Sequence, residues 1–253
     1  MSQLEQPLET TPTAPVSARR LRITHFFLLT ALCAFVATLR IAWVDWQSIP
    51  AENEKYYRTY SIFMAFVYGA AITSIILFVR QRWKTGQAQI TQPGHWLLLF
   101  LATTALLEGL VSLAVLAYIF DFTSSPQAEY YAWNLEKILL CSAVAINCFV
   151  FARRLQGNWC WKTLLYFPGC VLLALVPQHF FAMNNIWRNW FDSSHGYAQI
   201  LVCVINILLV ILGSFFDRRN RSQQDWLHWF GIVLIIVLAI AGVINGIRWI
   251  SYY

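Results

Sequence analysis

The chain has 253 residues, of which 58% are hydrophobic and only 12% are charged, and its formal net charge is +6. Soluble domains carry about twice that charged fraction, so the composition excludes a sizeable soluble domain and indicates that lipid surrounds most of the chain. The basic residues lie in short stretches at the ends of apolar runs, where they set orientation in the membrane, and they indicate no nucleic-acid partner.

The chain begins with residues 1–22, which we predict to be a disordered cytoplasmic tail. The first 18 residues are polar, include three prolines and lack Lys and Arg, a composition that cannot bury enough apolar surface to fold. Arg19, Arg20 and Arg22 then precede an apolar run of about the length of a full crossing, without a small-residue cleavage site. We therefore interpret this run as a retained helix and not as a signal peptide.

Seven apolar segments follow, and each is long enough to cross a membrane, since about 20 helical residues span the hydrocarbon core. The fold is therefore predicted to be all-α, with residues 23–253 forming one polytopic bundle of seven transmembrane helices. The predicted spans are 23–44, 59–80, 96–120, 131–152, 161–182, 197–216 and 227–250.

The charged residues between the spans alternate in kind along the chain. Basic clusters follow the second, fourth and sixth spans, whereas the loops after the first, third and fifth spans hold at least as many acidic as basic residues. Because basic loops stay in the cytoplasm, this pattern places the N-terminus in the cytoplasm and the C-terminus outside. The compact loops favour a prokaryote, so we expect a multi-pass protein of the cytoplasmic (inner) membrane.

Glu108 is the residue that most suggests a function. It lies about 13 residues into the third span, which at 1.5 Å per residue is close to the middle of the bilayer. An acidic side chain at that depth is costly and indicates a functional site by default. Two interpretations stay open: a proton-linked or contact carboxyl, and a hydrogen bond that serves only helix packing.

Four more charged residues enter the spans near the predicted outer side. Snorkelling toward the headgroups explains Arg40 in the first span and Arg248 in the last span. Glu136 and Lys137 enter the fourth span from outside and could pair with either arginine. These four residues form a candidate polar cluster in the outer leaflet.

An Ile-Asn pair recurs in three of the predicted spans, with its asparagine at Asn147, Asn206 and Asn245. No fixed period relates the three pairs, so we do not interpret them as an internal repeat. Asparagine side chains commonly hydrogen-bond between membrane helices, and the recurrence predicts such bonds here.

The sequence carries no recognisable catalytic or metal-binding motif. It has no HxxxH, HExxH, CxxC, GxSxG or Gly-rich phosphate loop, and no two histidines lie at mid-membrane positions on paired spans, as haem ligation would need. We expect no metal and no directly bound cofactor. Enzyme activity of the chain is left uncertain, and a non-catalytic role is favoured.

Several segments carry motifs of one membrane-protein family. The third span has a mid-membrane glutamate, Glu108, after an apolar run, and residues 134–142 read NLEKILLCS. The last span opens with DWLHWFGIV, which contains Trp226, His228 and Phe230. These segments resemble subunit III of haem-copper (cytochrome c) oxidases, a family with seven spans, a cytoplasmic N-terminus and about this length. The chain is similar to a diverged member, because the family's helix-six histidines are absent.

The resemblance implies an accessory role in a respiratory electron-transport chain. Subunit III holds no haem or copper, packs on the catalytic subunit, binds lipid, and supports proton uptake and stable turnover. For this chain the resemblance implies a larger haem-containing membrane partner, contact with membrane lipid and a structural phospholipid. It also implies a proton-linked or contact role for Glu108, and it makes Trp226 and His228 anchors of the last helix at the cytoplasmic interface.

A second hypothesis is a stand-alone small transporter, channel or ligand-sensing membrane protein. Such a protein would use Glu108 together with the outer polar cluster. Transporters usually have broken helices or inverted repeats, and neither is visible in the sequence. A membrane enzyme that acts on lipids is less favoured still, because no paired catalytic residues occur at helical spacing.

Overall fold

A computed structural model describes most of the chain outside its first 22 residues. The predicted tail, residues 1–22, lies outside the described part. The described residues are 23–46, 51–85, 92–121, 126–155, 157–183, 188–219 and 226–252.

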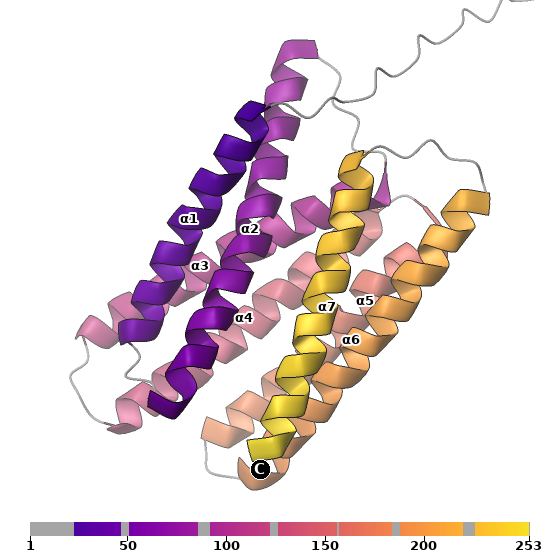
Figure 1. Ribbon diagram of the computed structural model, residues 1–253. Helices are drawn as coiled ribbons and strands as arrows, with labels where there is room; N and C mark the ends of the chain where they lie inside the picture. Colours follow the sequence, from indigo (N-terminus) through magenta and orange to yellow (C-terminus); the bar gives the residue numbers. More distant parts are fainter. Residues whose placement is uncertain are drawn as a thin grey trace, which may run out of the picture.

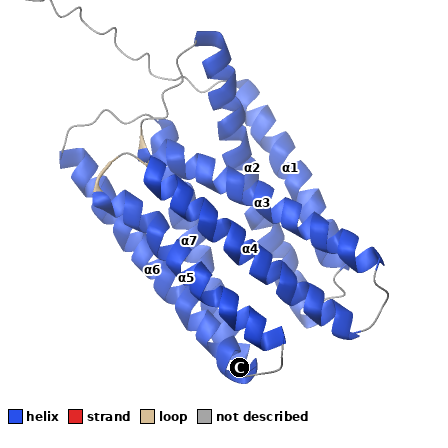
Figure 2. Ribbon diagram, turned by 180° about the vertical axis from the view of Figure 1, so that it is seen from behind, coloured by secondary structure: helices blue, strands red, loops and turns tan. Residues whose placement is uncertain are grey.

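Within these ranges the chain forms seven α-helices and no strand (Figure 1; Figure 2). Successive helices run in opposite directions, so the start of the first and the end of the last lie at opposite ends of the bundle (Figure 1). The helices are α1 (Ile23–Trp46), α2 (Ala51–Thr85), α3 (Pro93–Asp121), α4 (Pro126–Arg154), α5 (Trp159–Met183), α6 (Arg188–Arg219) and α7 (Trp226–Tyr252).

Six of the helices, α2 to α7, contain described segments that are long and apolar enough to cross a membrane. In α1 the described apolar stretch is shorter, Leu28–Ile41, although the helix itself has 24 residues. Large apolar side chains such as Leu110 on α3 and Phe215 on α6 are exposed, as expected of a surface that faces lipid. The protein is therefore an all-α, multi-pass membrane protein.

Each predicted span lies inside one helix, but two helices begin well before their predicted spans. Residues 51–58 were expected to belong to a loop, and they form the first turns of α2 instead. The side chains of Glu54 and Arg58, one helical turn apart, form an ion pair of 2.7 Å that supports this polar extension. Helix α6 likewise starts at Arg188, before the predicted span 197–216.

Local sequence signals explain three of the helix starts. Pro93 and Pro126 are the first residues of α3 and α4, where a missing N–H group costs nothing. Asn158 precedes α5, and its Oδ1 accepts a hydrogen bond from the Cys160 N–H at 3.0 Å, as an N-cap residue does. Gly157 has φ of +141°, so the turn between α4 and α5 needs glycine.

The helices pack mainly on their sequence neighbours, from α1 on α2 through to α6 on α7. Helix α7 then returns to pack on α3, so α3 to α7 form a closed group, and α1 joins it through its packing on α2 (Figure 1). The contact between α2 and α7 is slight. The α1–α2 pair therefore depends on α3 for most of its attachment.

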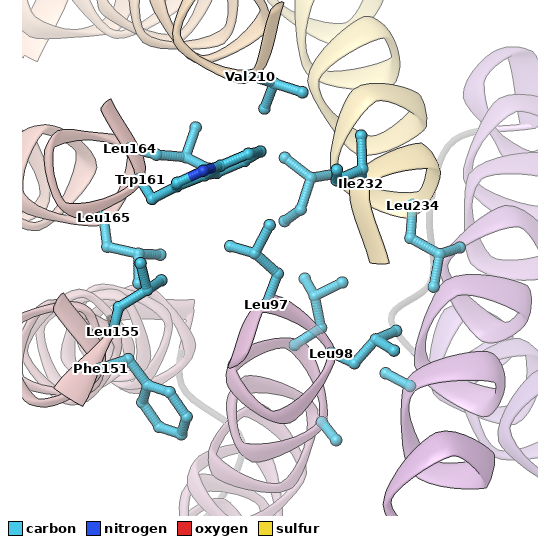
Figure 3. Close-up of a cluster of buried hydrophobic side chains, with 14 of the residues drawn as sticks. Leu97, Leu98, Phe151, Leu155, Trp161, Leu164, Leu165, Val210, Ile232 and Leu234 are labelled. Carbon is cyan, nitrogen blue, oxygen red and sulfur yellow. The ribbon is translucent and has the colours of Figure 1, made fainter. Parts of the chain in front are cut away.

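The hydrophobic core lies mostly toward one end of the bundle. We call this the packed end: α2, α4 and α6 end there, and α3, α5 and α7 begin there. Figure 3 shows the Trp161 indole between side chains of α6 and α7, with Leu97 of α3 beside them. The opposite end, where α2, α4 and α6 begin, we call the open end. By the charge pattern, the packed end is predicted to be cytoplasmic.

Candidate functional site

The mid-membrane glutamate lies in a cluster formed by three helices. The Arg40 Nη1 of α1 is 2.7 Å from the Glu108 Oε1 of α3, and both side chains are 24% exposed. The Tyr68 hydroxyl of α2 donates a hydrogen bond to the other oxygen, Oε2, of Glu108. The Arg40 guanidinium carbon also lies 5.5 Å from the centre of the Tyr68 ring. We call Arg40, Tyr68 and Glu108 the charged cluster.

A close approach of α1 and α2 aligns the cluster. A Cβ on Gly69 would meet the Cys33 Sγ at 2.6 Å and the Cys33 backbone at 2.8 Å, so the helices touch there. Because they are antiparallel, this register sets Arg40 near the level of Ile62. Side chains on a helix lean toward its N-terminus, so Arg40 leans toward the membrane middle and Tyr68 leans toward the open end. The two side chains therefore meet at Glu108.

This geometry corrects the prediction for Arg40. Snorkelling would direct its guanidinium to the headgroups, whereas the side chain leans inward and binds Glu108. The attraction of a carboxylate in surroundings of low polarity outweighs hydration of an exposed guanidinium, and the pair carries no net charge when both groups are ionised.

The structure gives contacts for three of the four residues of the predicted outer cluster. Glu136 of α4 is buried and accepts a hydrogen bond from the Ser112 hydroxyl of α3 at 2.7 Å. Arg248 of α7 lies over the ring of Tyr56 of α2, 3.6 Å from its centre. Lys137 is half-buried on α4.

Two of the three repeated asparagines form the predicted interhelical hydrogen bonds. The Asn147 amide of α4 donates to the hydroxyls of Thr103 and Thr104 on α3, both at 3.0 Å. Asn245 of α7 accepts from the Tyr56 hydroxyl of α2 and donates to the Gln199 side chain of α6 at 3.3 Å. The third, Asn206, differs, because its buried Oδ1 has no hydrogen-bond partner among the described residues.

The start of the last helix is tightly packed against α3. His228 is fully buried, and its Nδ1 accepts a hydrogen bond from the Gly94 N–H of α3 at 3.0 Å. A Cβ on Gly94 would overlap the His228 carbonyl, so the backbones of α3 and α7 are in contact. Trp226 is the first residue of α7, and its side chain lies outside the described part.

A second network at the packed end was not predicted. The Trp161 indole N–H of α5 donates to the Asp217 Oδ2 of α6 at 3.0 Å, and the Asn158 amide donates to the Asp217 Oδ1 at 3.0 Å. The Trp161 ring packs edge-on against His228, with centroids 6.2 Å apart. We call Asn158, Trp161, Asp217 and His228 the tryptophan network.

One sequence signal could have pointed to this network. Asn158 precedes an apolar run as an N-cap does, and Trp161 brings an N–H group into that run, which requires an acceptor when it is buried. The partner on α6 could not be identified, because sequence does not show which helices are neighbours. The same limit applies to Tyr68 in the charged cluster.

Many of the polar side chains described above form contacts between helices. Within the described ranges, no three His, Cys, Asp or Glu side chains gather as metal ligands would. The six cysteines are free thiols. Comparison of the chain with protein-family models, with functionally described proteins and with solved structures found no match. The resemblance to oxidase subunit III therefore rests on the sequence motifs alone.

Proposed function

We propose that this chain is a non-redox accessory subunit of a larger respiratory complex in a cytoplasmic membrane, with a role similar to that of oxidase subunit III. The proposal rests on the observation that polar side chains of the membrane spans bind one another across helices. Glu108, Glu136, Asn147 and Asn245 each bind a side chain of another helix. A subunit that serves assembly needs such internal contacts, whereas a transporter needs polar groups that can bind its substrate.

Within this proposal Glu108 is a contact carboxyl. Both of its oxygens have partners, and these come from the two helices of the α1–α2 pair. An unpaired charge at the centre of a membrane helix costs about 2.5–3.5 kcal/mol on insertion scales, so the ion pair with Arg40 stabilises the attachment of α1 and α2 to α3. Proton transfer through Glu108 would first require that this pair opens.

The lateral surface of the bundle offers space for a larger partner. Exposed apolar side chains follow α5 and α6, among them Leu173, Phe180, Leu208 and Phe215. In lipid, helix association depends on side-chain packing and not on the burial of apolar surface from water. A polytopic partner would cover part of this surface, and lipid would cover the rest.

The test is purification of the tagged protein from its native membranes in a mild detergent. A reduced-minus-oxidised optical spectrum and mass spectrometry of the eluate then identify haem and co-purifying subunits. We expect haem bands and a large polytopic subunit. A colourless eluate that contains this chain alone would contradict the proposal and favour the stand-alone transporter, channel or sensor.

A pair of variants separates the contact role of Glu108 from a proton-linked role. We expect Glu108→Gln to reduce the amount of co-purifying partner, while the haem content and turnover of each assembled complex stay unchanged. Glu54→Gln is the matched control, because it removes a carboxylate from the surface ion pair with Arg58, and it should leave assembly intact. Normal assembly with slowed proton-coupled turnover in Glu108→Gln would instead assign the proton-linked role.

A further inference from the structure

We infer that the packed end binds the headgroup of an anionic phospholipid at the ends of α4 and α6 and the start of α5. Five cationic side chains at these positions are exposed, and we call them the basic rim. The inference does not depend on the proposed accessory role. The basic rim consists of Arg153, Arg154, Lys162, Arg218 and Arg219.

The fold brings the basic rim together from three helices. Helices α4 and α5 are joined by residues 155–158 only and pack closely on each other. The hydrogen bonds from Asn158 and Trp161 to Asp217 hold the start of α5 against the end of α6. The helix ends that carry these cations, which lie far apart in the sequence, therefore share one edge of the bundle (Figure 1).

Asp217, the one carboxylate described at this edge, is half-buried. Each oxygen of Asp217 accepts a hydrogen bond, one from the buried Trp161 indole and one from the Asn158 amide. The five exposed cations of the basic rim outnumber this single carboxylate, so the edge carries a net positive charge. Arg218 also lies over the Trp229 ring, 5.3 Å from its centre, which fixes one cation of the rim in place.

The surface next to the basic rim is suited to an acyl chain. Trp159 is 60% exposed at the start of α5, the position of an interfacial tryptophan. On α6 the exposed side chains of Leu208, Ile211 and Phe215 follow one stripe at helical spacing toward the rim. A soluble anion would use the cations alone, whereas an anionic phospholipid would use both the cations and the stripe. Clusters of basic residues at the cytoplasmic side of membrane helices bind such headgroups.

The experiment uses the delipidated full-length protein in detergent, so membrane orientation does not enter. Dioleoyl phosphatidylglycerol or dioleoyl phosphatidylcholine is titrated into the micelles, and binding is followed by the thermal unfolding midpoint and by native mass spectrometry. The rim variant is R154Q/K162Q/R219Q. The control variant K55Q/R58Q/R80Q removes the same number of exposed cations elsewhere.

For the wild type and the control variant we expect phosphatidylglycerol to bind at least about tenfold more tightly than phosphatidylcholine, and the preference to weaken in high salt. The rim variant should lose that preference while keeping its midpoint in detergent alone. Equal loss in both variants, or equal binding of the two lipids by the wild type, would overturn the inference. An equal midpoint shift with inorganic phosphate would overturn it as well, in favour of a soluble anion.

Discussion

The packed end and the open end of this bundle are held together by different means. At the packed end, α3 and α7 touch through their backbones at Gly94, and the fully buried Trp161 fills the space between α5, α6 and α7. Toward the open end α6 and α7 still approach closely at Gly246, but fewer core residues lie there, and polar side chains bridge other helices, as Tyr56 does to Asn245 and Arg40 does to Glu108.

The difference shows what a polar contact contributes at each end. At the packed end, hydrogen bonds such as that from Trp161 to Asp217 add to dense packing that already fixes the helices. In the charged cluster, the ion pair replaces packing, because α1 has its extensive contacts with α2 and reaches α3 through Arg40. Removing a bulky side chain should therefore matter most at the packed end, and removing a charge should matter most at the charged cluster.

The largest effect is expected for Trp161→Ala. The variant leaves a large cavity at the junction of three helices and deprives Asp217 of a donor, which should lower the free energy of unfolding by about 3–5 kcal/mol. Reversible unfolding by SDS in mixed micelles measures this. Trp159→Ala, two residues earlier and 60% exposed, should change the stability by no more than about 0.5 kcal/mol.

Trp161→Phe refines the same test. It keeps an aromatic ring in the packed end and removes the N–H group, so the loss should fall to about 1–2 kcal/mol. A loss as large as that of the alanine variant would mean that the hydrogen bond to Asp217, and not packing, dominates this end. The contrast between the two ends would then disappear.

An intermediate effect is expected when the ion pair of the charged cluster is broken. Glu108→Gln or Arg40→Gln alone leaves one charge unpaired, and each should lower the free energy of unfolding by about 2–3 kcal/mol. The double variant should cost clearly less than the sum of the single variants, because no unpaired charge remains. SDS unfolding of all four proteins gives the coupling energy.

The surface pair Glu54–Arg58 provides the control cycle for the same measurement. It has the same distance of 2.7 Å, but both side chains lie within α2 and are more exposed. Its coupling energy should be only about 0.3–0.5 kcal/mol. Equal coupling in the two cycles would show that the charged cluster is no stronger than a surface ion pair.

The contrast also explains which features could be predicted from the sequence. The helices follow from the length of the apolar runs, and Glu108 was identified because a charge in such a run is costly. That Asn147 and Asn245 form hydrogen bonds between helices was predicted, because an amide side chain in lipid needs a hydrogen-bond partner. The partners themselves were not predicted, because they depend on how each helix is rotated about its axis and on which helices are neighbours.

Arg40 illustrates this limit most clearly. Its position near the outer end of the first predicted span favoured snorkelling. The direction of its side chain, however, is set by the antiparallel register of α1 and α2, which depends on the contact of Gly69 with Cys33. Trp161 was overlooked for a related reason: a tryptophan near the end of a span is typical of a headgroup belt, and only the helix packing shows that it is buried.

The last comparison is between two glycines of α3, one tightly packed and one exposed. Gly94 lies at the packed end, where an added Cβ would overlap the His228 backbone, so Gly94→Ala must force α3 and α7 apart. The expected loss is about 1–3 kcal/mol, since overpacking is relieved only by backbone movement. Gly109 is exposed, and a Cβ there would have no atom within 4 Å. Gly109→Ala should therefore be neutral or stabilising by up to about 1 kcal/mol, because alanine favours the helix.

If Gly94→Ala lowers the free energy of unfolding while Gly109→Ala raises it, the tight packing of α3 lies at Gly94, where α3 contacts α7. SDS unfolding measures the free energy of unfolding of both variants. Gly231→Ala tests the same contact from the α7 side, because its Cβ would overlap the Gly94 carbonyl. If Gly94→Ala were as harmless as Gly109→Ala, the backbones of α3 and α7 could separate at little cost. The packed end would then depend on large side chains such as Trp161 and not on backbone contact.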